Sequence, residues 1–133
     1  MRRNEMRAPD FVSHMIEAVQ RIERYTHGKT REQFLGDPLI QDAVLRNFEN
    51  LGEASKNLLE ELPDAPSRFP EIPFGKIYGT RNQLSHGYFF VDLEIIWETI
   101  ENRIPSLRIA LEAAEKSFNV TLQLDLARIF RSL

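Results

Sequence analysis

One short segment of the chain, residues 81–88, holds three side chains that could act together on a phosphodiester. Arg81 is followed after four residues by His86, and one residue later by Tyr88. Arginine is a permanent cation whose planar fork matches a phosphate. Histidine, with an unperturbed pKa of about 6.5, can move protons near neutral pH. Such a pair could cleave RNA without a metal, with His86 as general acid or base and Arg81 holding the phosphate and its developing charge.

The spacing of this pair also predicts how its members must meet. Residues five positions apart on an ideal helix are separated by about 140° around the axis and about 7.5 Å along it. A shared site therefore needs a long reach by Arg81, or a second copy of the segment across a two-fold axis. Spacing alone leaves a plainer interpretation open, with Arg81 paired to a surface acid, His86 a polar helix-end residue and Tyr88 a packing aromatic.

The composition predicts one globular domain spanning residues 1–133, with 42% hydrophobic and 28% charged residues. The absence of cysteine excludes disulfides and thiolate metal sites and fits a cytoplasmic location. The N-terminus does not resemble a signal peptide, and no apolar run approaches the roughly 18 residues that span a bilayer. The net charge of −3 excludes a generally basic surface, so any RNA contact requires a local cleft.

The apolar periodicity and the capping signals predict an all-α fold. We expect a first helix from an Asp10 cap to Gly28, a second from Asp37–Pro38 to Pro63, a third from about Phe74 to His86, and a fourth from an Asp92 cap to about Phe118, broken near Pro105. Four prolines between residues 63 and 73 predict an extended surface crossing. The predicted architecture is an antiparallel bundle of four long helices, with a core of about residues 8–118 and a tail, 119–133, that carries a short helix over 121–133.

The surroundings of the Arg–His pair resemble a known family. Residues 72–89, with Arg81-Asn82, His86 and Tyr88, resemble the HEPN superfamily, and more closely its HepT-like toxins. Residues 42–56, which contain the sequence Gly-Glu-Ala, resemble the second helix of that family, and residues 91–97 resemble the start of its fourth helix. The resemblance covers about residues 8–115. Thr80 departs from it, because the family often has a larger apolar residue there, and residues 116–133 receive no role from it.

The resemblance implies a homodimer that acts as a metal-independent endoribonuclease, the toxin of a type II or type VII-like toxin–antitoxin pair. Arg81 and His86 would form the catalytic pair and Asn82 would support it, with no cofactor and no metal. The partner would be an MNT-type nucleotidyltransferase antitoxin that can transfer AMP to the motif tyrosine, here Tyr88. The added nucleotide would occupy the cleft and repel the RNA phosphate.

Other residues keep two interpretations. A polar stripe on the second helix is either a solvated face or part of the cleft, where Glu53 could orient Arg81; its members are Arg46, Asn50, Glu53 and Asn57. Gly52 indicates close helix packing. His14 and His27 are expected at the surface and at a helix end, and Trp97 in the core or a dimer interface.

The tail and the function also stay open at this point. The apolar face of the tail either contacts a partner or folds back on the bundle; it comprises Leu122, Leu126, Ile129 and Phe130. Two other functions remain possible: a non-catalytic subunit that binds substrate or nucleotide for a nucleotidyltransferase, or a structural adaptor whose site is degenerate.

Overall fold

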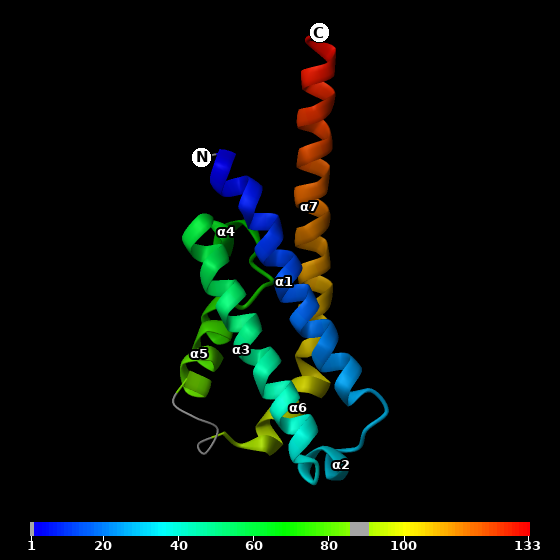
Figure 1. Ribbon diagram of the computed structural model, residues 1–133. Helices are drawn as coiled ribbons and strands as arrows, with labels where there is room; N and C mark the ends of the chain where they lie inside the picture. Colours follow the sequence, from blue (N-terminus) through cyan, green and yellow to red (C-terminus); the bar gives the residue numbers. More distant parts are fainter. Residues whose placement is uncertain (1, 86–90) are drawn as a thin grey trace.

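The computed structural model describes residues 2–85 and 91–133, and within these ranges the chain is all-α (Figure 1). The described ranges hold seven helices and no strand: α1 (Arg2–Thr26), α2 (Arg31–Leu35), α3 (Pro38–Glu61), α4 (Ala65–Arg68), α5 (Phe74–Ser85), α6 (Leu93–Asn102) and α7 (Ile104–Arg131). The prediction of an all-α fold is therefore confirmed for the described residues. His86 and Tyr88 lie outside the described residues.

The helices contact one another in the order α5, α3, α1, α7. Helix α3 packs on α1 along one side and on α5 along the other, and α7 packs on the far side of α1. Helix α6 contacts α7 and the short α2 at the end of the molecule where α1 turns into α2 (Figure 1). The fourth long helix of the prediction is thus two elements, and only α7 packs along α1.

The core forms where the apolar periodicity predicted it. Along α3 and its C-cap, the positions that a spacing of three and four residues places on one face are all buried, namely Val44, Phe48, Leu51, Ser55, Leu58 and Leu62. Met15, Val19 and Ile22 of α1, the helix that packs on α3, are fully buried. Trp97 is only 7% exposed, and its ring centroid lies 5.4 Å from that of Phe34. Trp97 is therefore a core residue, the first of its two interpretations.

Capping side chains set several helix boundaries as expected. Asp37 accepts a hydrogen bond from the backbone N–H of Ile40 at 3.2 Å, and Asp92 accepts one from that of Glu94 at 2.9 Å. Each pairing satisfies an N–H group that has no partner within the helix. Helix α6 ends at Asn102, and α7 starts with Pro105 in its first turn, where the missing N–H costs nothing. The predicted break near Pro105 is confirmed.

The first connection contains a helix that the prediction lacked, and α1 begins earlier than predicted. Helix α1 starts at Arg2 and passes through Pro9, so Asp10 is an interior residue and not the cap. Helix α2 begins with a capping box. The Thr30 hydroxyl accepts a hydrogen bond from the Gln33 backbone N–H at 3.1 Å, and the Gln33 side chain accepts one from the Thr30 backbone N–H at 2.9 Å. Five residues of helix are too few to show a helical period in the sequence.

The proline-rich segment 63–73 is not the extended surface crossing that we predicted. It contains α4, with Pro66 in its first turn, and it buries Ala65, Phe69 and Ile72. Prolines are tolerated at the start of a helix, so a high proline content did not exclude a short one.

The predicted separate helix over residues 121–133 is also wrong. Helix α7 runs without a break to Arg131, and the Thr121 hydroxyl donates to the Ser117 carbonyl within the same helix. Phe118 is its last buried residue; beyond it the apolar side chains are exposed, among them Leu122, Leu126, Ile129 and Phe130. The end of α7 projects past the start of α1 instead of folding back (Figure 1).

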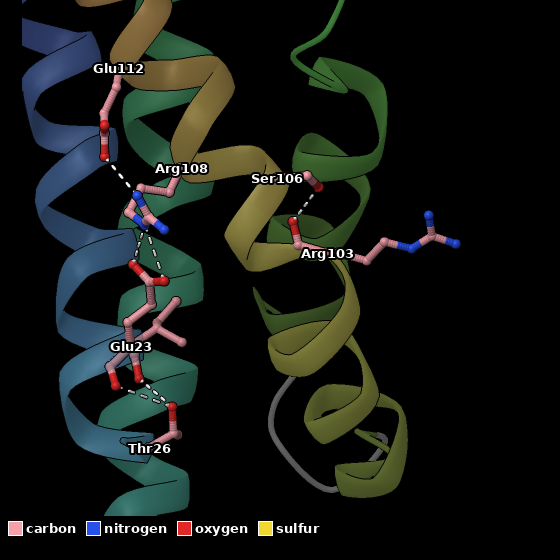
Figure 2. Close-up of polar contacts among 7 residues, drawn as sticks. Glu23, Thr26, Arg103, Ser106, Arg108 and Glu112 are labelled. Carbon is pink, nitrogen blue, oxygen red and sulfur yellow. Dashed lines mark hydrogen bonds and ion pairs between the residues drawn. The ribbon is translucent and has the colours of Figure 1, made fainter. Parts of the chain in front are cut away.

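An ion-pair cluster joins α7 to α1 (Figure 2). The Arg108 guanidinium contacts the Glu23 carboxylate at 3.0 Å and the Glu112 carboxylate at 3.1 Å. The hydrogen bonds that Arg108 donates to Glu112 and to Glu23 raise the pKa of Arg108 above its ordinary value. Among the described helices, none combines the length and the apolar character that a bilayer crossing demands.

Candidate active site

Helix α5 carries Arg81 and presents it to α3. The Arg81 Nε–H donates a hydrogen bond to the Glu53 carboxylate at 2.8 Å, across 28 residues of sequence. The Arg81 side chain is 29% exposed and that of Glu53 is 51% exposed, so the pair lies at the surface. Among the described residues, Arg81 is bound through Nε alone, which restrains the plane of the guanidinium and leaves its two terminal amino groups for another ligand. This is the contact we expected if Glu53 orients Arg81.

Gly52 lets α5 come this close to α3. A Cβ added at Gly52 would lie 2.5 Å from the Arg81 Cβ, which is shorter than side chains tolerate. The two backbones therefore pack at the base of the Arg81 side chain, and the packing interpretation of Gly52 is confirmed. Gly52 and Glu53 are adjacent on α3. Gly52 leaves room for the Arg81 side chain, and Glu53 accepts its hydrogen bond.

The other predicted site residues are only partly placed. Asn82 is exposed on α5, one position beyond Arg81. Helix α5 ends at Ser85, so His86 follows it directly in the sequence. The geometry of His86 and Tyr88 relative to Arg81 falls outside the described residues, and their roles stay predictions.

A small polar groove lies between α1 and α3, on one side of the Glu53–Arg81 pair. Its volume is about 260 Å³, and α3 lines it with Asn47, Asn50, Glu53 and Asn57. The opposite wall comes from α1, with His14, Glu17 and Arg21. The predicted polar stripe is therefore divided, because Arg46 lies apart from the groove and pairs with Glu49 at 3.7 Å. Sequence reasoning missed Asn47, Glu17 and Arg21, although their helical spacing places them on the groove faces.

A second, larger groove has a volume of about 830 Å³. It lies between α5, the segment 68–73 and the corner where α6 meets α7. Its walls are mainly apolar, with Ile77 and Leu107 among them, and its charged residues are Arg68, Lys76, Arg103 and a single acid, Glu71. Figure 2 shows the Arg103 side chain extending away from the helices. For a chain with a net charge of −3, this is a local basic cleft of the kind that RNA contact would require.

The residues available for a metal are few. Within the part of the chain that the structure describes, no group of three or more histidine, aspartate or glutamate side chains could hold a metal ion. His14 and His27 are both exposed, and His14 contacts the Phe11 ring edge-on, with centroids 6.3 Å apart.

Comparison with known proteins places this chain in a class of ribonucleases. The family model described as "Ribonuclease HepT-like" matches residues 15–114, and the chain belongs to this family. The match includes α3, α5 and the segment between α5 and α6, and it ends before the exposed part of α7.

Individual relatives agree with the family assignment. A protein of Thermococcus cleftensis named "Probable ribonuclease HepT" is 38% identical over 107 residues, which are 80% of this chain and 94% of the relative. A protein of Methanocaldococcus jannaschii named as a candidate RNase is 35% identical, over 80% of this chain and 84% of its own. Another candidate RNase, from Caldanaerobacter subterraneus, is 36% identical, over 73% of this chain and 84% of its own. No solved structure matches the chain significantly.

Proposed function

We propose that this protein is a metal-independent endoribonuclease and the toxin of a toxin–antitoxin pair. The observation that carries the proposal is the Arg81–Glu53 pair, set on the α3–α5 contact in a chain of the ribonuclease HepT-like family. Glu53 occupies Nε, so the terminal amino groups of Arg81 are the part of the fork that would hold a phosphate.

The reaction needs one base, one acid and one cation. A neutral His86 takes the proton of the RNA 2′-OH while the oxygen attacks the adjacent phosphorus. The P–O5′ bond breaks, and a protonated histidine gives its proton to the leaving 5′ oxygen. The products are a 2′,3′-cyclic phosphate and a 5′-OH. Arg81 stabilises the charge on the pentacoordinate phosphorus.

A homodimer fits this scheme for a geometric reason. On an ideal helix, residues five positions apart such as Arg81 and His86 would point in different directions, and a two-fold axis would bring a second copy of each toward the first. Two copies of His86 would then be available as the base and the acid.

The basic groove between α5 and the α6–α7 corner would take the RNA strand. Lys76 and Arg103 line it, and Thr80 lines it one residue before Arg81. Phosphate contacts by such side chains release counterions, so binding should weaken as salt rises. Replacing Lys76 or Arg103 by alanine should weaken binding of all RNA sequences alike and reduce the salt dependence by about one counterion each.

Control of the toxin would come from a nucleotidyltransferase antitoxin that transfers AMP to Tyr88. The added group carries bulk and negative charge next to the bound phosphate, and it would exclude RNA. Tyr88→Phe should abolish the modification without preventing cleavage. A toxin that carried AMP on Tyr88 and cut RNA at the full rate would contradict this account.

The central experiment is cleavage of RNA by the purified protein in excess chelator. Arg81→Ala and His86→Ala should each lower the rate by about 10²–10⁴-fold, while the matched control His27→Ala, at an exposed helix end, should not. Activity that disappears in chelator and returns with a divalent ion would overturn metal independence. If neither the parent nor the variants cleave RNA, and the protein binds a nucleotidyltransferase tightly, the chain is a non-catalytic subunit instead.

A further inference from the structure

The polar groove between α1 and α3 contains a buried hydrogen-bond acceptor without a partner. Asn47 is 5% exposed and lines the groove, and its Nδ2 donates to the Ala43 carbonyl at 2.9 Å. Its Oδ1 is buried and has no hydrogen bond in the described part of the chain. Leaving such an acceptor unpaired costs about 1–3 kcal/mol. Because Oδ1 is shielded from solvent, the Asn47 side chain must rotate before an N–H group of a ligand in the groove can pair with it.

Two more amides line the same face of α3. Asn50 and Asn57 are half-buried in the groove, and their side chains form no hydrogen bond to any other described residue. Asparagine is a poor helix former, because its side chain competes with the backbone for hydrogen bonds. Three asparagines on one helix face weaken α3 relative to alanine, and this cost is expected where side chains are kept for binding.

The charges of the groove are already balanced. Arg21 pairs with Glu17 on α1, and Glu53 pairs with Arg81. No unpaired cation in the described lining would favour a second phosphate, and no cluster of acids would favour a metal. The remaining groups are amides, which bind a neutral ligand with fixed donors and acceptors.

Size and shape restrict that ligand further. The volume of about 260 Å³ lies just below the roughly 300–1,000 Å³ typical of sites for drug-sized molecules. The His14 ring lies at the rim, exposed and held against Phe11, where it could stack on a flat ring. Amides that read donors and acceptors, beside an aromatic ring, are the usual means of binding an unstacked base in single-stranded RNA.

We propose that the α1–α3 groove binds the nucleobase next to the phosphate held by Arg81. This inference rests on the proposed ribonuclease function, and Glu53 connects the two sites because it lines the groove and binds Arg81. After rotation of its side chain, Asn47 accepts a hydrogen bond from an N–H group of the base, and Asn50 and Asn57 bind the rest of its edge. The groove thereby sets which base adjoins the cut.

The first test measures binding directly and does not depend on cleavage. The four ribonucleoside monophosphates and ribose 5-phosphate are titrated separately into the ¹⁵N-labelled protein. The side-chain amide signals of Asn47, Asn50 and Asn57 should shift with at least one nucleotide and stay unchanged with ribose 5-phosphate. If no nucleotide shifts them, the groove holds water only and the proposal fails.

Variants then separate a binding role from a structural one. Asn50→Ala and Asn57→Ala each improve helix propensity, so both proteins should fold, and each should weaken binding of that nucleotide about fivefold or more. Asn119→Ala, at an exposed position of α7, is the matched control and should leave binding unchanged. Unchanged affinity in both groove variants would overturn the proposal.

The second test maps cut sites in an RNA of random sequence. The parent protein should cut preferentially beside the base that binds the groove, and the preference should fall about fivefold or more in Asn50→Ala. Cleavage without base preference, together with unshifted amide signals, removes the groove proposal and leaves the ribonuclease intact. Nucleotide binding at the groove without any cleavage removes the ribonuclease and leaves the binding site.

Discussion

The α-carbon of Gly52 faces the Arg81 side chain so closely that a Cβ at Gly52 would stand 2.5 Å from the Arg81 Cβ. Because the next residue, Glu53, binds the same arginine at 2.8 Å, the α3–α5 contact and the position of Arg81 depend on each other. A change on either side of this contact should therefore move the guanidinium that we propose holds the phosphate.

Gly52→Ala should destabilise the protein and lower RNA cleavage. The added methyl group forces α5 away from α3, and overpacking typically costs about 1–3 kcal/mol, against roughly 1 kcal/mol gained in helix propensity. Gly79→Ala is the matched control on α5, because a Cβ there would meet no atom within 4 Å. Urea unfolding and cleavage of a labelled RNA measure both effects. A Gly52→Ala protein as stable and active as the parent would show that the contact does not position Arg81.

Glu53→Ala should lower RNA cleavage by about tenfold or more, whereas Glu53→Gln should retain a large part of it. Glutamine keeps an oxygen that can accept from Arg81 Nε, and alanine leaves the guanidinium free to rotate. Stability should change by less than about 1 kcal/mol in either variant, since the pair is exposed to solvent. Glu60→Gln is the control, because Glu60 lies on the same helix and its Oε1 pairs with the Lys56 Nζ at 3.9 Å instead of with Arg81. Equal losses in the two Glu53 variants would indicate a role for the carboxylate charge instead of orientation.

Ser55→Ala should stabilise the protein by about 1–2 kcal/mol. The Ser55 hydroxyl is completely buried and has no hydrogen-bond partner in the described structure, and alanine removes this unsatisfied group and improves helix propensity. Ser13→Ala, at an exposed position of α1, measures the propensity gain alone. Chemical unfolding of both variants gives the difference. A smaller gain at Ser55 than at Ser13 would mean that the hydroxyl is satisfied in solution.

Removal of residues 119–133 should leave the fold and its stability nearly unchanged. No side chain of this part of α7 is buried, so little apolar area is lost to solvent. Phe118→Ala should instead cost about 3–5 kcal/mol, because Phe118 is 7% exposed and its ring lies 5.4 Å from that of Phe69. Thermal unfolding followed by circular dichroism compares the two proteins. A large loss of stability on truncation alone would show that the exposed end of α7 has a partner in solution.

Arg108→Lys should make the α1–α7 contact sensitive to alkaline pH. Glu112 and Glu23 raise the pKa of Arg108, so its stabilising charge is fully present below the ordinary value and is lost only when pH passes the raised one. That point lies beyond any useful buffer, so the parent should show no loss from this group. A lysine titrates from about 10.4 upward and should lose its stabilising effect as pH rises toward 11. Melting temperatures at pH 8 and pH 10.5 test this, and identical shifts in both proteins would contradict it.

The sequence alone determined the helices that local signals define. The caps at Asp37 and Asp92, the break at Pro105 and the apolar face of α3 all depend on residues within a few positions of one another, and all appear in the structure. The close helix packing predicted at Gly52 also appears in the structure. Such signals are readable because capping and helical periodicity act over one or two turns.

Tertiary structure decided what distant segments build together. The Arg81–Glu53 bond spans 28 residues, and the amide groove requires α1 and α3 to pack in one particular register. Local signals also failed where packing overrides them, as in the buried residues of segment 63–73. In α7 the local preference prevails instead. Its backbone hydrogen bonds continue the helix to Arg131, although Phe118 is its last buried residue. Short-range preferences fix where helices start and stop, whereas burial and contact between helices determine which side chains meet.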